Sequence, residues 1–218
     1  MPPKPQFGNS LNAIALFFCI NIYLILVFGS ETFNLSIFGD DGAISILTIC
    51  FVLAAQLFVL YEMATAAKLT HKIDWFILAY ILQIYVMREA DFHRTFTSTN
   101  VTKTSFYLNA SNPLYTKLIA GSILILCFLA VLYLASKYVV FCLKLLNYRT
   151  PWTISALFWF SLLILSQLFD KSALNDTQDL RVQNIEEMLE FSAAIYLFLA
   201  AILYNLGKTD SGGLVSNE

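Results

Sequence analysis

Six stretches of the chain are apolar over lengths close to that needed to cross a lipid bilayer. A helix rises about 1.5 Å per residue, so a hydrocarbon core of about 30 Å takes roughly 20 mostly apolar residues. Because backbone polar groups in lipid must be satisfied within the segment, such stretches fold as helices. The sequence therefore predicts an all-α, polytopic transmembrane helix bundle. Its six predicted helices cover residues 11–29, 43–67, 74–87, 115–136, 151–169 and 186–206.

The composition supports a membrane protein and excludes several other classes. Of the 218 residues, 58% are apolar and only 13% are charged, whereas a soluble domain carries roughly 25% charged residues. The net charge of −2 argues against nucleic acid as a partner, because nucleic-acid binding needs a basic surface. All four cysteines lie inside apolar stretches without close spacing, which argues against a disulfide framework or a zinc knuckle. The predicted environment is the lipid bilayer.

The distribution of bases predicts the orientation and the extent of the membrane domain. Residues 1–207 are expected to form a single transmembrane helical domain, followed by a disordered tail at 208–218. The positive-inside rule places both termini in the cytoplasm, because the first outer loop, at 30–42, carries acids and no base. Four bases on the predicted outer side, between residues 88 and 117, oppose this orientation. The expected cytoplasmic bases are Lys4, Lys68, Lys72, Lys137, Lys144, Arg149 and Lys208.

Acidic residues gather at the outer ends of the third, fifth and sixth predicted helices. If the third helix continues past Met87, Glu89 and His93 share a helix face, because they are four residues apart. Glu186 and Glu190 have the same spacing on the sixth helix. Glu190 stands one turn deeper than the start of its helix and is followed by apolar residues. A carboxylate at that depth is costly in lipid, so Glu190 is expected to face the bundle interior or a wet cavity.

These residues together predict a buried acidic and histidine site near the outer leaflet. One imidazole and several carboxylates suit Mg²⁺, Mn²⁺, Ca²⁺ or a di-iron centre better than zinc. Glu187 or Asp91 would act as a base or support a ligand. Two alternatives stay open: an ion-pair network with the neighbouring bases, and a proton or ion pathway. The predicted metal ligands are Glu89, His93, Asp170, Glu186 and Glu190.

Two segments resemble a family of small polytopic bacterial inner-membrane proteins. The first is Arg88-Glu89-Ala90-Asp91-Phe92-His93-Arg94-Thr95-Phe96-Thr97, and the second is the run Glu186-Glu187-Met188-Leu189-Glu190. The resemblance covers about the last two-thirds of the chain. It implies a bacterial inner (plasma) membrane location and no particular activity.

The functional expectation is an integral membrane protein that acts as a metal-dependent hydrolase or oxidase on a lipid-like substrate. The alternative is an ion- or proton-coupled transporter, or a structural subunit of a membrane complex, in which the same residues form an ion-pair network. The sequence leaves open whether the protein is an enzyme, and it is compatible with an oligomer or a partner subunit.

Overall fold

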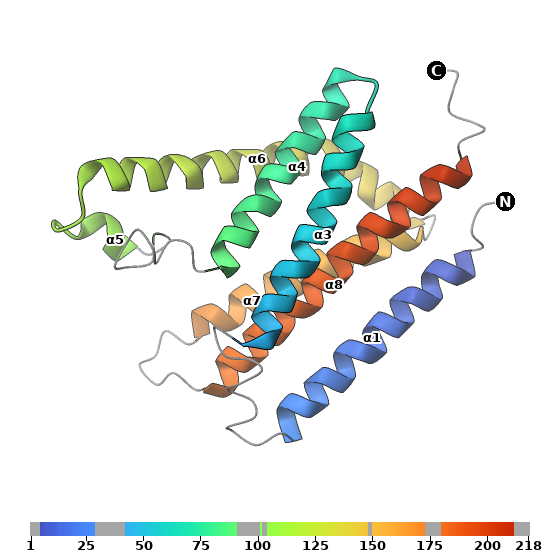
Figure 1. Cartoon of the computed structure of the whole chain (residues 1–218), viewed down its shortest axis with the longest axis horizontal. Helices are drawn as coiled ribbons and strands as arrows, with labels where there is room; N and C mark the ends of the chain where they lie inside the picture. The colour runs from blue at the N-terminus through green and yellow to red at the C-terminus, as the bar shows by residue number, and fades with distance from the viewer. Residues whose placement is uncertain are drawn as a thin grey trace. The chain divides into compact units, whose positions relative to one another are not determined.

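The computed structural model describes residues 5–28, 42–90, 101, 104–147, 150–172 and 180–211, and these residues form helices and short turns without a strand. This confirms the all-α class. The helices carry the labels of Figure 1. They are α1 (Pro5–Phe28), α3 (Ala43–Thr65), α4 (Leu69–Glu89), α5 (Thr104–Leu108), α6 (Leu114–Asn147), α7 (Pro151–Ser172) and α8 (Leu180–Ser211).

Five helices in the described part of the chain are long and apolar enough to cross a membrane, which indicates an integral membrane protein. The third predicted span corresponds to α4, a helix of 21 residues that includes Lys72, Asp74, Arg88 and Glu89 and is not among the five. The count of six spans and the orientation therefore stay predictions. The five spans are Gly8–Ile25, Ala43–Thr65, Leu114–Tyr138, Pro151–Leu168 and Asn184–Leu206.

Several helix ends follow from local chemistry. α7 begins at Pro151, where the missing N–H of proline costs nothing in the first turn. The carbonyl of Thr150 accepts hydrogen bonds from the backbone N–H groups of Thr153 and Ile154. α8 begins at Leu180, six residues before the predicted start at 186, so the polar residues of its first turns extend the helix beyond the apolar run. It continues to Ser211, and residues 212–218 of the predicted tail lie outside the described part.

The chain divides into two compact units. The first comprises Met1–Phe58 and Cys142–Glu218 and is called the α1–α7–α8 unit. The second comprises Val59–Phe141 and is called the α4–α6 unit. The single domain at residues 1–207 stays a prediction.

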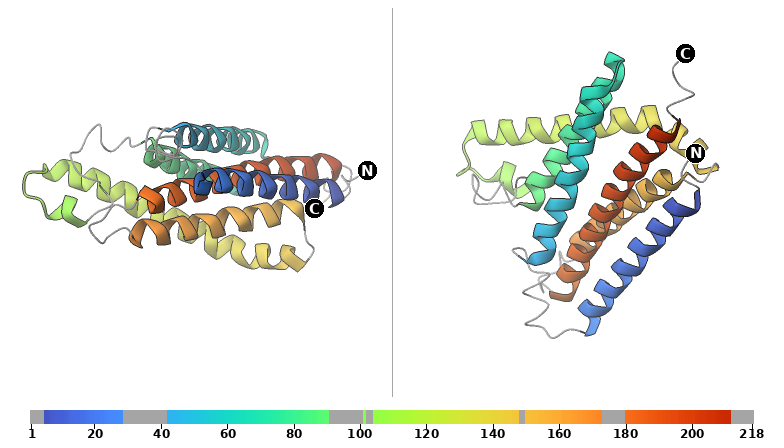
Figure 2. Two further views of the ribbon diagram at one scale, coloured as in Figure 1. Left: turned by 90° about the horizontal axis from the view of Figure 1, so that it is seen from below. Right: turned by 45° about the vertical axis from the view of Figure 1, so that its right-hand side comes forward.

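In the α1–α7–α8 unit the three helices run side by side (Figure 2). α1 passes close to the start of α7 at Gly8, where a Cβ atom would lie 2.4 Å from the Cβ of Pro151. Only glycine allows this approach of two backbones. One turn later, Ser155 donates a hydrogen bond to the side-chain oxygen of Asn12 at 2.7 Å. The core of this unit comprises Ala15, Cys19, Ile44, Met188, Phe191, Ile195 and Tyr196.

The α4–α6 unit contains the end of α3 together with α4, α5 and α6. α4 buries Ala79, Leu82 and Val86, and the hydroxyl of Tyr80 donates to the backbone carbonyl of Ile123 in α6 at 3.2 Å. No residue of the span Leu114–Tyr138 is buried in the protein. Since this span is apolar, its exposed side chains suit contact with lipid tails.

Candidate functional site

The predicted site residues have different places in the structure. Asp91 and His93 lie outside the described residues. Asp170 lies in the last turn of α7, but its side chain is outside the described part. Glu89 ends α4 and belongs to the α4–α6 unit. The other three, Glu186, Glu187 and Glu190, are on α8.

α8 brings two of these carboxylates together within the α1–α7–α8 unit. A carboxylate oxygen of Glu187 and one of Glu190 lie within 4.8 Å of each other. Glu190 is only 3% exposed, as its depth in the sequence predicted, whereas Glu187 is half-buried. The three-residue spacing puts both side chains on neighbouring positions of one helix face. We call Glu187 and Glu190 the α8 carboxylate pair.

α7 supplies neutral hydrogen-bond donors to the α8 carboxylate pair. The hydroxyl of Ser166 and the amide nitrogen of Gln167 both donate to Oε1 of Glu190, each at 3.5 Å. These bonds are at the long end of the useful range. Two ionised carboxylates this close repel each other, and a cation or a shared proton between them relieves the repulsion.

Glu89 makes an ion pair within its own unit. Its Oε1 lies 3.9 Å from Nε of Arg88, and the two side chains are 4% and 39% exposed. This contact is of the kind that the ion-pair alternative expected. Glu89 as a metal ligand stays a prediction.

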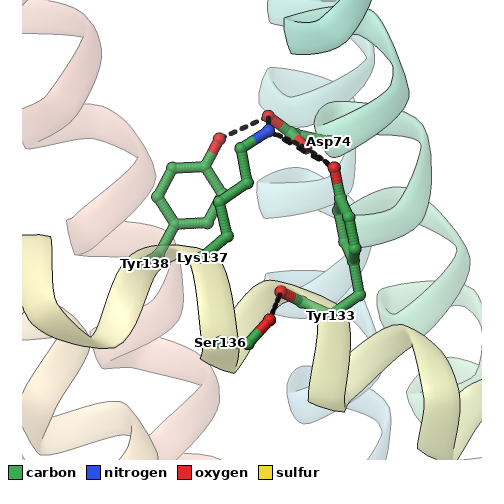
Figure 3. A network of polar contacts seen from close by, with 5 residues as sticks. All are labelled: Asp74, Tyr133, Ser136, Lys137 and Tyr138. Carbon is green, nitrogen blue, oxygen red and sulfur yellow. Dashed lines mark hydrogen bonds and ion pairs between the residues drawn. The ribbon is translucent and has the colours of Figure 1, made fainter.

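Sequence reasoning missed a second polar site, in the α4–α6 unit (Figure 3). Asp74 of α4 accepts hydrogen bonds from three side chains of α6. Nζ of Lys137 lies 2.8 and 2.7 Å from the two carboxylate oxygens, and the hydroxyl of Tyr133 donates at 3.0 Å. The hydroxyl of Tyr138 donates to the second carboxylate oxygen. We call Asp74, Tyr133, Lys137 and Tyr138 the Asp74 network.

The Asp74 network stabilises the ionised form of its carboxylate. Asp74 lies near the start of α4, outside the five candidate spans. Burial alone would raise the pKa of its carboxyl, but the hydrogen bonds from Lys137, Tyr138 and Tyr133 outweigh burial and hold the pKa below its ordinary value. The contribution of the ionised pair to stability is therefore present at neutral pH, and it is lost only as the pH falls through the lowered pKa.

A sequence signal for this network existed. Asp74 is the only acid between Glu62 and Glu89, and Lys137 is the only base between Lys117 and Lys144. Lys137 lies within an apolar span, where a charge is costly unless it meets an opposite charge. The positive-inside rule counts Lys137 only as a base that sets the orientation.

Comparison with known proteins does not assign the chain to a family. No protein-family model matches the chain, and no curated protein or solved structure is significantly similar to it. The fold and the site define an all-helical integral membrane protein with buried carboxylates. Its function is therefore argued from the residues.

Proposed function

We propose that the α8 carboxylate pair binds a divalent cation and that the protein is a metal-dependent hydrolase or oxidase acting on a lipid-like substrate. The observation that carries the proposal is the approach of the Glu187 and Glu190 oxygens to within 4.8 Å, with Glu190 3% exposed. Carboxylates at such a separation can share one ion, and Mg²⁺, Mn²⁺, Ca²⁺ and iron accept oxygen ligands. A cation held there would activate water or dioxygen.

The other proposed ligands of the metal ion are residues that the sequence predicts. Asp170 follows Ser166 by four residues on α7, and Ser166 is a donor to Glu190, so this helix register supports Asp170 as a ligand. Glu186 precedes the pair on α8. Glu89 and His93 complete the proposed ligand set, with Asp91 or Glu187 as the base. Glu187 would act as the base when the other proposed ligands hold most of the ion's coordination.

A lipid-like substrate fits the surroundings of the donors on α7. Ile164, Leu165 and Leu168 are 49%, 41% and 59% exposed, and they flank Ser166 and Gln167 along the helix. An acyl chain could lie along these side chains and reach the carboxylates from within the bilayer. The location that we propose, a bacterial inner membrane, rests on the sequence resemblance alone.

Elemental analysis of the protein purified in mild detergent tests the proposal. The test compares the wild-type protein with the Glu187→Gln/Glu190→Gln double variant. Glu62→Gln is the matched control, because Glu62 is also 3% exposed but belongs to the α4–α6 unit. We expect one divalent ion per chain in the wild type and in the control, and none in the double variant.

Other results would replace the proposal with one of its alternatives. Wild-type protein without a stoichiometric metal, both as purified and after incubation with Mg²⁺, Mn²⁺, Ca²⁺ or Fe²⁺, would remove the metalloenzyme. Proton- or ion-coupled flux in vesicles that depends on Glu190 would favour the transporter. Neither metal nor flux, together with unfolding of the double variant, would favour a structural subunit.

A further inference from the structure

The exposed side chains of the turn between α3 and α4 carry positive charge. α3 ends at Thr65 and α4 begins at Leu69. Lys68, His71 and Lys72 are all exposed. The two lysines alone give this segment a formal charge of +2.

The two acids that flank this turn do not offset that charge at the surface. In the segment from Val59 to Asp74, all of which is described, the acids are Glu62 and Asp74. Glu62 is 3% exposed, so it lies away from the lysines' solvent-facing side. Asp74 is 6% exposed and is neutralised by Lys137, whose Nζ lies 2.7 Å from its carboxylate. Within residues 59–74, Lys68 and Lys72 therefore carry the exposed charge.

Exposed apolar side chains lie beside these lysines. Leu69, Ile73 and Phe76 are 71%, 45% and 62% exposed. Their spacing places them on one stripe of α4, and Lys72 follows Leu69 by three residues at the border of that stripe. A lysine with its stem along apolar surface and its ammonium group pointing out is typical of a segment at a membrane surface.

We propose that the first turns of α4, with Lys68 and Lys72, bind the headgroups of anionic phospholipids in the adjacent leaflet. The negative charge of the phosphate group balances the positive charge of the lysines, and the acyl chains cover Leu69, Ile73 and Phe76. Each lysine near an anionic membrane surface strengthens binding about fivefold, so the two together contribute about 30-fold. This site belongs to the α4–α6 unit and does not depend on the metal site of the other unit.

Lipid binding to the detergent-solubilised full chain tests the proposal. The protein is titrated with short-chain phosphatidylglycerol, with short-chain phosphatidylcholine and with inorganic phosphate. We expect phosphatidylglycerol to bind more tightly than phosphatidylcholine, and its affinity to fall as salt is added, because salt screens exposed charges. Inorganic phosphate, which lacks acyl chains, should bind far more weakly.

Variants test whether binding depends on these two lysines or on any loss of positive charge from the protein. Lys68→Gln/Lys72→Gln should lower the affinity for phosphatidylglycerol about 30-fold. Lys117→Gln, which removes a lysine from the first turn of α6, should leave it unchanged. Equal thermal midpoints for both variants and the wild type establish that the fold is intact. Wild-type affinity in the double variant, or equal binding of both lipids, would overturn the proposal. A lysine-dependent affinity for inorganic phosphate that equals the affinity for phosphatidylglycerol would also overturn it.

Discussion

The Asp74 network and the α8 carboxylate pair bury an acid in two different ways. Asp74 meets a lysine and two tyrosine hydroxyls from α6, with the Lys137 ammonium group 2.7 Å away. Glu190 receives hydrogen bonds of 3.5 Å from the neutral side chains of Ser166 and Gln167, and its helical neighbour Glu187 is a second acid. A buried charge is costly unless it is paired. The first arrangement joins two helices through an ion pair, whereas the second sets two acids side by side on one helix.

This difference indicates a structural role for the Asp74 carboxylate and leaves a chemical role to the α8 carboxylate pair. All three N–H donors of the Lys137 ammonium group are accounted for, because Nζ also lies 3.3 Å from the hydroxyl of Tyr133. The Asp74 network therefore has little capacity for a further ligand. Two carboxylates side by side offer several acceptor oxygens, which are the ligand atoms that hard divalent cations take. The following predictions test the contrast, beginning with the variant expected to have the largest effect.

Replacement of Lys137 with methionine should cause the largest loss of stability. The substitution leaves the Asp74 carboxylate, whose side chain is 7% exposed, without its cation. Removing one partner of a buried ion pair destabilises a protein more than removing both partners does, because the remaining charge stays buried without compensation. Thermal unfolding in detergent should therefore show a lower midpoint for Lys137→Met than for Asp74→Asn/Lys137→Met. Equal midpoints for the wild type and Lys137→Met would mean that the ion pair does not hold α4 and α6 together.

Gly8→Ala should destabilise the α1–α7–α8 unit by about 1–3 kcal/mol, the usual cost of overpacking. The new Cβ would lie 2.4 Å from a carbon of the rigid proline ring of Pro151. Gly121→Ala is the matched control in α6, because its Cβ would meet Cε1 of Tyr107 at 3.7 Å, an ordinary contact. Chemical denaturation should show a loss for Gly8→Ala and none for Gly121→Ala. A similar effect of both substitutions would contradict the close approach of α1 and α7.

Tyr138→Phe should cost about 1 kcal/mol, since it removes one hydrogen bond to Asp74 and keeps the ring. Tyr115→Phe is the control, because Tyr115 is 65% exposed. The same unfolding assay measures both. If Tyr138→Phe is as stable as the wild type, the carboxylate of Asp74 does not depend on that hydroxyl, and the contrast with Glu190 weakens.

Glu190→Gln should have the smallest effect on stability in metal-free buffer, because it keeps the side-chain volume and removes the repulsion from Glu187. Added Mn²⁺ should then stabilise the wild type but not Glu190→Gln. At 100 times its dissociation constant a ligand stabilises its protein by about 2.7 kcal/mol. The wild type should show this gain in its unfolding midpoint, and Glu190→Gln should not. A gain of the same size in the variant would exclude Glu190 as a ligand.

The lengths of the apolar stretches were enough to predict the long helices but not their partners. The apolar stretch at 151–169 predicted the start of α7 at Pro151, because the length of an apolar run is a local signal. The burial of Glu190 also followed from its depth in an apolar helix. The Asp74 network was missed because Asp74 and Lys137 are 63 residues apart, and no local rule pairs them. The early start of α8 was missed because its first turns are polar and give no apolar period.

The most direct test of the central claim is a titration of the purified protein with Mn²⁺, followed by electron paramagnetic resonance. The claim is that Glu187 and Glu190 hold one divalent cation between them. We predict that the wild type and Glu62→Gln remove one equivalent of Mn²⁺ from the free-ion signal, whereas Glu187→Gln/Glu190→Gln removes none. The same uptake by the double variant and the wild type, or no uptake by either, would contradict the claim.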